Sequence, residues 1–159
     1  MKKRILALLL VIVVISITSC VDIFGDVADT GNVTVVIENL DKSYDVYEVN
    51  LKDVDSENKK EGAKGIIHHL SEKDENALYA VMADGAYGAY VNEIGSLKNN
   101  EPTGYYIIVY TSVEGDAYLG ENVPTVNYEG ITLYQSNSGI SGMKIEPGTV
   151  ILFRSEFYG

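Results

Sequence analysis

Apolar and polar residues alternate along several short stretches of this chain. A period of two is typical of β-strands, because successive side chains of a strand point to opposite faces. Residues 33–37 and 44–52 each predict a strand that has an apolar face. Every second residue forms that face: Val33, Val35 and Ile37 in the first stretch, and Tyr47, Val49 and Leu51 in the second.

Residues 104–113, "GYYIIVYTSV", are apolar on both faces. Such a segment predicts a central strand that is covered on both sides. Three further strands are predicted at 130–135, 139–145 and 149–155. The segment Glu146-Pro147-Gly148-Thr149 predicts a tight turn, because proline presets one φ angle and glycine accepts a positive φ at the next position.

The middle of the chain is harder to interpret. The charged residues 53–65 predict a solvated loop, and "GIIHHL" at 65–70 predicts a short strand. Ser71, with Asp74 three residues later, resembles a helix N-terminal cap and predicts a helix near residues 71–84. The alternative is a hairpin of 78–83 and 86–94 around Asp84-Gly85. The helix is favoured.

Short strands separated by glycine and asparagine indicate a mainly β fold. We therefore expect residues 33–159 to form a single domain, an antiparallel β-sandwich of immunoglobulin-like or transthyretin-like type with one short helix. The chain has a single cysteine, which rules out an intramolecular disulfide, so the domain has to be stabilised by packing.

The first 19 residues have the layout of a secretory signal. Lys2, Lys3 and Arg4 precede an apolar run of 14 residues that ends at Thr18. A permanent helical span needs about 20 apolar residues. The run is therefore too short to cross a bilayer comfortably, and we expect it to be removed.

The end of this signal, Ile17-Thr18-Ser19-Cys20, resembles the lipobox of bacterial lipoproteins. The resemblance implies that Cys20 is modified with diacylglycerol and that the chain is cleaved just before it. In many bacteria the new amino terminus is also acylated, and two or more acyl chains anchor a protein far more firmly than one. Residues 20–32 would then form a short acidic tether. Because Val21 rather than aspartate follows Cys20, the resemblance also makes an outer-membrane or cell-surface location plausible.

Charge limits the candidate partners. Removing residues 1–19 takes away three of the 12 basic residues and none of the 23 acidic ones, so the net charge changes from −11 to −14. A surface of this sign repels nucleic acid and anionic lipid headgroups. Attachment to the membrane is therefore expected through the lipid on Cys20 alone, and nucleic acid is not an expected partner.

No recognisable catalytic motif or cofactor-binding motif occurs in the chain, and we expect neither a cofactor nor a metal. His68 and His69 would point to opposite sides of the predicted strand. The acidic stretch 53–57 resembles the start of a calcium-binding EF-hand loop. However, Asn58 stands at the position of the loop glycine and Lys64 at that of the final glutamate. The segment 139–142, "GISG", lacks the spacing of a hydrolase nucleophile elbow.

The 12 tyrosines are the most informative candidates for binding. A tyrosine ring with its hydroxyl offers contact area at low entropy cost, and this suits both proteins and sugars as ligands. Tyr87 and Tyr90 flank the Asp84-Gly85 turn and are the expected ligand contacts. We therefore expect a non-catalytic binding module of the bacterial envelope for protein or glycan. The alternatives are a structural accessory of envelope assembly and, less favoured, an enzyme.

Overall fold

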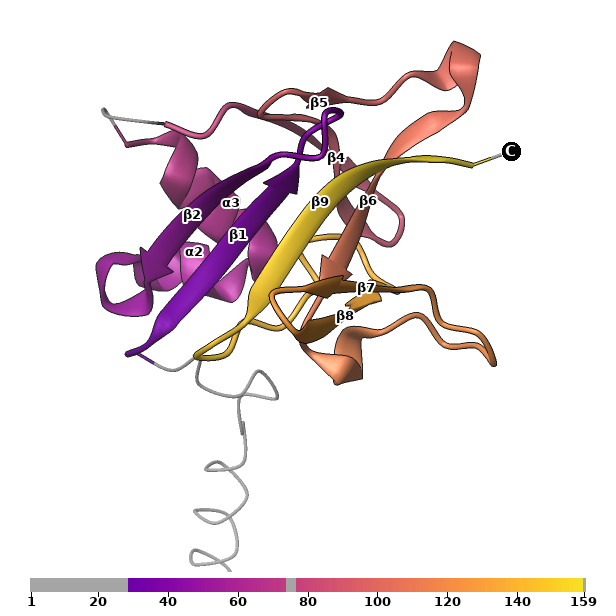
Figure 1. The fold of residues 1–159 in the computed structure, drawn as a ribbon. Helices are drawn as coiled ribbons and strands as arrows, with labels where there is room; N and C mark the ends of the chain where they lie inside the picture. The colour runs from indigo at the N-terminus through magenta and orange to yellow at the C-terminus, as the bar shows by residue number, and fades with distance from the viewer. Residues whose placement is uncertain (1–28, 74–76, 159) are drawn as a thin grey trace, which may run out of the picture.

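The computed structural model describes residues 29–73 and 77–158, and it is mainly β (Figure 1). The strands are β1 (Asn32–Glu38), β2 (Tyr44–Asn50), β3 (Ala80–Gly85), β4 (Gly88–Ile94), β5 (Leu97–Lys98), β6 (Tyr105–Thr111), β7 (Thr125–Tyr128), β8 (Ile131–Gln135) and β9 (Val150–Phe157). The helices are α2 (Ser56–Lys60) and α3 (Ala63–Ser71), with short 3-10 turns η1 (Leu51–Asp53), η2 (Glu101–Thr103) and η3 (Glu114–Asp116).

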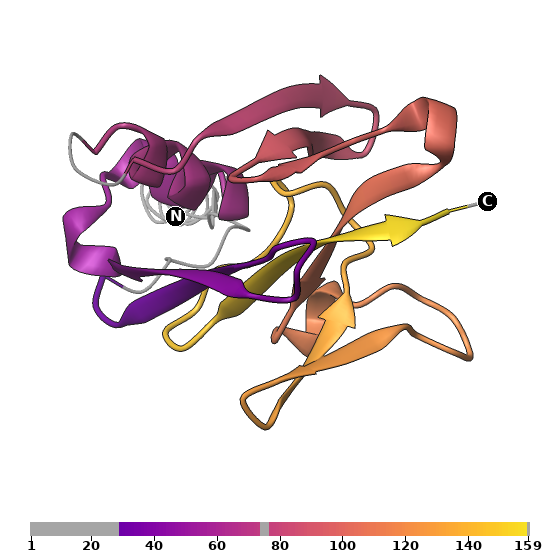
Figure 2. The same cartoon turned by 45° about the horizontal axis from the view of Figure 1, so that its top comes forward.

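The strands form two sheets. The large sheet has the order β2-β1-β9-β6-β8-β7, and the small sheet has the order β3-β4-β5. Figure 2 shows the helices and the small sheet together in one layer above β1 and β9, while the β7–β8 hairpin lies below them. The predicted mainly β, sandwich-like fold is confirmed. One pairing departs from a purely antiparallel arrangement, since β1 and β9 run parallel.

Alternation along β1 divides the interior into two cores. Val33, Val35 and Ile37 point towards the helices and the small sheet and belong to the first core. Val36 points to the other face and belongs to a second core, which includes Tyr128 of β7 and Leu133 of β8. The strand β6 contributes to both cores, as its two apolar faces predicted.

The turn before β9 also follows the sequence. The amide of Thr149 donates a 3.0 Å hydrogen bond to the carbonyl of Glu146, and Gly148 has a φ of +87°. This is the predicted tight turn. The strands predicted at 33–37, 44–52, 104–113, 130–135 and 149–155 correspond to β1, β2, β6, β8 and β9.

The predicted helix near residues 71–84 was wrong, because α3 ends at Ser71 and residues 80–85 form strand β3. Ser71 is not an N-terminal cap. Its hydroxyl instead donates a 2.9 Å hydrogen bond to the carbonyl of Ile67 inside α3. The alternative hairpin is the correct interpretation, with Gly85 paired to Gly88.

Three other local predictions were also wrong. The charged residues 53–65 contain α2 rather than only a loop, and residues 65–70 lie within helix α3 rather than a strand. Residues 139–145 form no strand, although their apolar side chains are buried in the first core. Strand β7 was not predicted.

Candidate ligand-binding site

The hairpin of β3 and β4 presents the two tyrosines that the sequence singled out. Gly88 takes a φ of +101°, a region that favours glycine and that allows the chain to turn sharply after Tyr87. The Tyr87 side chain at this turn is 89% exposed, and Tyr90 on β4 is 49% exposed. Both rings are therefore accessible.

The outer face of the small sheet continues from Tyr90 as a mixed aromatic and charged surface. Ala83 is paired with Tyr90, and Val81 is paired with Glu93, on the face opposite the first core. The Tyr79 hydroxyl donates a 3.2 Å hydrogen bond to Oε2 of Glu93. This surface offers rings and a carboxylate side by side.

The charges on this surface are paired locally. A hydrogen bond from Lys98 holds the pKa of Glu93 below its usual value, so this carboxylate is ionised at neutral pH. The hydrogen bond to Glu93 raises the pKa of Tyr79, which keeps its hydroxyl a donor.

A groove of about 180 Å³ lies beside Tyr90, where β4 faces β6. Its apolar walls come from both strands, and its polar groups come from the end of β8 and the segment that follows. The lining residues are Ala89, Tyr90, Val91, Ile107, Ile108, Val109, Gln135, Ser136, Ser138, Gly139 and Ile140. Tyr90 therefore belongs both to the exposed outer face and to the groove.

Specific hydrogen bonds hold the two sides of this groove in place. Asn99 bridges the sheets, because its Nδ2 donates to the carbonyl of Val91 at 3.1 Å and its Oδ1 accepts from the amide of Ile107 at 2.7 Å. On the other side, the amide of Ala89 donates to Oγ of Ser141 at 2.9 Å. The groove is therefore built into the fold.

The residues of the groove come from segments that are far apart in the sequence. Gln135, Ser136 and Asn99 were not predicted as site residues. No local motif marks them, because their proximity to Tyr90 depends on how the small sheet packs against β6.

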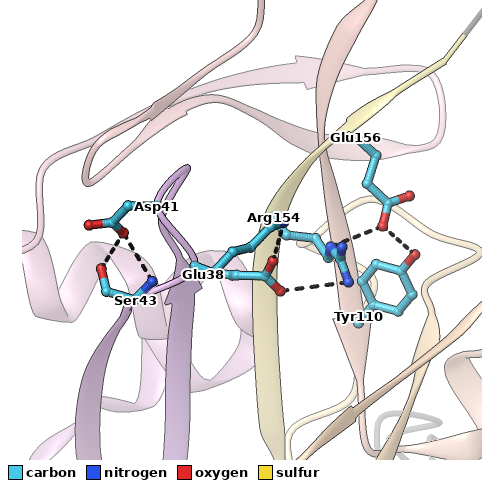
Figure 3. Close-up of polar contacts among 7 residues, drawn as sticks. Glu38, Asp41, Ser43, Tyr110, Arg154 and Glu156 are labelled. Atoms are coloured by element: carbon cyan, nitrogen blue, oxygen red, sulfur yellow. Dashed lines mark hydrogen bonds and ion pairs between the residues drawn. The ribbon is translucent and has the colours of Figure 1, made fainter.

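A second polar cluster lies on the other face of the large sheet (Figure 3). Arg154 Nη1 lies 3.6 Å from Oε2 of the buried Glu38, and Arg154 Nε lies 3.1 Å from Oε1 of Glu156. The Tyr110 hydroxyl donates to that same Glu156 oxygen at 2.8 Å. Burial, together with this bond, raises the pKa of Tyr110 well above its usual value. In this cluster one guanidinium lies between two carboxylates, and Nζ of Lys42 lies 2.7 Å from Oε1 of Glu38.

The two histidines lie on α3, and neither lines the groove beside Tyr90. His68 is exposed, with its Nδ1 3.7 Å from Oε1 of Glu72. Burial lowers the pKa of His69, which keeps its ring neutral at pH 7. The strand context in which they were analysed was wrong, since consecutive residues of a helix point about 100° apart.

The acidic stretch 53–57 has a local structural role. Asp55 is the N-terminal cap of α2, and its Oδ1 accepts hydrogen bonds from the amides of Glu57 and Asn58, both at 2.9 Å. Its second oxygen accepts from Asn58 Nδ2 at 2.7 Å. The carboxylate is therefore engaged by its own helix.

No protein-family model matches this sequence, and no curated protein matches it. Among solved structures, the chain resembles a protein of Ruminococcus gnavus ATCC 29149 described as a "putative metal binding protein". The TM-score is 0.51 at 12% sequence identity, and the match covers 81% of this chain and 99% of that chain. At this identity the likeness shows a shared fold alone.

The side chains of this protein bear on metal binding independently of that likeness. Within residues 29–73 and 77–158, no group of three or more histidine, cysteine, aspartate or glutamate side chains is placed to hold a metal ion. The likeness to the Ruminococcus gnavus protein is therefore one of strand arrangement.

The predicted signal, the predicted lipobox (Ile17, Thr18 and Ser19) and Cys20 lie outside the described residues. Among the helices that the structure does describe, none has the length and apolar character needed to cross a membrane. Asp29, the first described residue, contacts the helix α2, because its Oδ1 lies 2.9 Å from Nζ of Lys59.

Proposed function

We propose that this protein is a bacterial lipoprotein, anchored through lipid on Cys20, whose domain binds a glycan at the groove beside Tyr90. The observation that carries the binding proposal is the position of Tyr90, which is shared between an exposed outer face and a groove. Aromatic rings suit the apolar faces of sugars, and amide and hydroxyl groups suit sugar hydroxyls. Gln135, Ser136 and Ser138 supply such groups in the same groove.

A glycan fits this groove better than a protein surface does. Stable protein interfaces bury about 800 Å² on each partner. A groove of about 180 Å³ accommodates one small ring or a short side chain rather than a broad partner surface. We accordingly place the sugar in the groove and a neighbouring unit against the Tyr87 ring at the hairpin turn.

The test is a glycan array probed with the chain from Val21 onward. Both hydrophobic cores are made of residues between Val33 and Phe153, so this part of the chain contains all of them. We expect binding to a defined set of glycans that is lost in Tyr90→Ala. The matched control is Tyr158→Ala, which removes a ring that is also exposed but lies at the end of β9.

Two results would oppose the proposal. The first is a wild-type chain that binds no glycan on the array. The second is glycan binding that Tyr90→Ala and Gln135→Ala leave unchanged, since both side chains line the groove.

The anchor needs its own experiment. Cells producing the full chain would be labelled with an alkyne analogue of palmitate. We expect the wild-type protein to carry the label and Cys20→Ala to lack it. Equal labelling of both chains, or recovery of the uncleaved chain by mass spectrometry, would contradict the proposed lipid attachment.

A second candidate function, an accessory of envelope assembly, is favoured by a different observation. The large sheet has an unpaired edge at β2. This edge is separate from the groove beside Tyr90, so it would bind a different partner.

A further inference from the structure

Within residues 29–73 and 77–158, strand β2 forms one outer edge of the large sheet and is paired with β1 alone. Its seven residues pair with β1 in an unbroken register. Two of the other sheet edges are less suited to pairing. β7 at the opposite edge has only four residues, and the pairing of β3 with β4 in the small sheet shifts register between Val81 and Met82.

Two backbone hydrogen bonds show which backbone groups of this hairpin point towards β1. At one end the amide of Asn39 donates to the carbonyl of Ser43 at 2.8 Å, and at the other the amide of Leu51 donates to the carbonyl of Gly31 at 2.8 Å. Residues of an antiparallel strand alternate between bonding to the partner strand and pointing away. The odd-numbered residues of β2 therefore bond to β1, and the even-numbered residues Tyr44, Val46 and Glu48 direct their backbone groups outward.

A groove of about 490 Å³ follows this edge. It is lined by five consecutive β2 residues, Tyr44 to Glu48, and by Leu70 and Lys73 at the end of α3. Tyr44 and Val46 have side chains that are 47% and 49% exposed. The edge thus combines unpaired backbone groups with apolar side chains, which is the combination used for strand addition.

The hairpin that carries this edge is held in shape at its turn (Figure 3). Oδ1 of Asp41 accepts hydrogen bonds from the amide of Ser43 at 3.0 Å and from its hydroxyl at 2.6 Å. Asn39 Nδ2 donates to Oδ2 of Asp45 at 3.0 Å. A template that is already ordered costs less entropy to bind than a mobile one.

Features that commonly block an exposed edge are missing from β2. Within its seven residues there is no proline and no lysine, and its register with β1 has no bulge. Its charged side chains, Asp45 and Glu48, are both acidic. They oppose pairing with another acidic strand but not with a basic one.

We propose that the β2 edge binds an extended segment of a partner protein that carries basic side chains, which adds to the large sheet as an extra strand. Charge complementarity selects this occupant. Asp45 and Glu48 lie on opposite faces of β2, and the whole chain has a net charge of −11. A second copy is disfavoured because it would bring the same carboxylates together along one seam.

The alternation of β2 also defines the side chains of the partner. On the face of β2 that points away from α3, Tyr44 and Val46 favour apolar neighbours, and Glu48 favours a basic one. On the face towards α3, Asp45 favours a basic neighbour. A segment in which apolar and basic residues alternate places its apolar side chains beside Tyr44 and Val46 on one face and its basic side chains beside Asp45 on the other.

The probe is an acetylated octapeptide of alternating valine and lysine, added to the chain from Val21 onward. Hydrogen exchange monitored by NMR would report the amides individually. We expect new protection at Tyr44, Val46 and Glu48, and no new protection at Asp45 and Tyr47, whose amides already bond to β1. A valine–glutamate octapeptide serves as the control and should not bind.

Val46→Pro gives a sharp test of the backbone contact. Proline removes an outward N–H that β1 does not use, and its ring occupies the edge. We expect affinity for the valine–lysine peptide to fall about tenfold. Val46→Thr, which keeps the N–H, should bind within about twofold of the wild type.

A second variant keeps the proposal falsifiable if Val46→Pro does not fold. Asp45→Lys combined with Glu48→Lys retains every backbone group and reverses the charge of the edge, so it should lose the valine–lysine peptide. Unchanged binding by this variant, equal binding of the valine–glutamate peptide, or protection at β7 in place of β2 would each overturn the proposal. So would concentration-dependent dimerisation that protects the β2 amides without peptide, since the occupant would then be a second copy.

Discussion

The hydroxyl of Tyr110 donates a 2.8 Å hydrogen bond to Oε1 of Glu156, and these two residues are 46 positions apart in the sequence. The bond joins β6 to β9 at the edge of the second core. It also occupies the carboxylate oxygen that lies 3.1 Å from Nε of Arg154. The Tyr110 hydroxyl therefore helps to hold the Glu156 carboxylate beside the Arg154 guanidinium.

Tyr110→Phe should destabilise the domain. The ring remains in the second core, while Glu156 loses one donor. A hydrogen bond to a charged group contributes about 1.5–3 kcal/mol, so we expect a loss at the lower end of this range. Urea unfolding would measure it. Tyr106→Phe is the control, because the same hydroxyl is removed from the same strand without a described hydrogen bond, and a loss as large as that of Tyr110→Phe would contradict the interpretation.

The pH dependence of stability should carry the signature of the same residue. Burial and the bond to Glu156 raise the pKa of Tyr110 in the folded state above the value near 10 that it has when unfolded. Its contribution is complete below about pH 10 and is lost as the pH rises towards the folded-state pKa. The difference in unfolding free energy between wild type and Tyr110→Phe should therefore shrink above pH 10.

Urea unfolding at pH 8, 10 and 11 would test this. Tyr47 and Tyr128 also have raised pKa values, but they are present in both proteins and cancel in the comparison. If the difference in unfolding free energy between the two proteins stayed constant up to pH 11, the raised pKa of Tyr110 in the folded state would be contradicted.

Asn99 provides a test of how the two sheets are joined. Asn99→Ala leaves the carbonyl of Val91 and the amide of Ile107 without this partner. We expect a loss of about 2 kcal/mol, because unsatisfied buried groups cost about 1–3 kcal/mol each and these are only partly buried. Asn99→Asp keeps the acceptor for Ile107 but places an oxygen against the Val91 carbonyl. The unfolding free energy of Asn99→Asp should be lower than that of the wild type at pH 7. It should recover partly below pH 4, where the protonated carboxyl can donate a hydrogen bond to the Val91 carbonyl. If both variants were as stable as the wild type, the bridging role of Asn99 would be refuted.

Gly65 sets how closely the two helices approach. A Cβ at this position would lie 1.7 Å from the carbonyl oxygen of Asn58, so Gly65→Ala forces α2 and α3 apart. Alanine normally stabilises a helix relative to glycine by about 1 kcal/mol. Here we expect the opposite sign and a loss of about 1–3 kcal/mol from overpacking.

Gly115→Ala is the matched control, since its nearest contact is the flexible end of Lys144 at 3.7 Å. Thermal unfolding should show a lower midpoint for Gly65→Ala than for the wild type. The midpoint of Gly115→Ala should be almost unchanged. A stabilised Gly65→Ala would mean that the helices do not pack in this way.

The strands that could be predicted from the sequence are those whose pattern depends only on their own two faces. β1 places Val33, Val35 and Ile37 against the first core, and β6 is apolar on both sides because both cores contact it. The turn at Pro147-Gly148 was predictable for the same reason, since its φ angles are set by the local residues.

The helices could not be predicted because they depend on contacts that are distant in the sequence. Residues 65–70 are a short apolar run, which is ambiguous between strand and helix. They become helical where Gly65 allows the chain to pack against Asn58. α2 has no buried residue at all, so no apolar periodicity marks it, and its start is fixed by the cap at Asp55.

The candidate site was predictable only at Tyr87 and Tyr90, whose exposure follows from the hairpin turn. The groove itself depends on Asn99 and on the segment after β8, which approach β4 only in the folded domain. Whether either tyrosine contacts a ligand stays a prediction.

The parallel pairing of β1 with β9 has a consequence for the order of events during biosynthesis. β9 inserts between β1 and β6, so the centre of the large sheet is completed by residues 150–157. A nascent chain that has not yet emerged beyond residue 149 lacks the strand that joins its two halves. Such late, non-local closure slows folding, and under the proposed export this delay would leave the chain time to cross a translocation channel before it compacts.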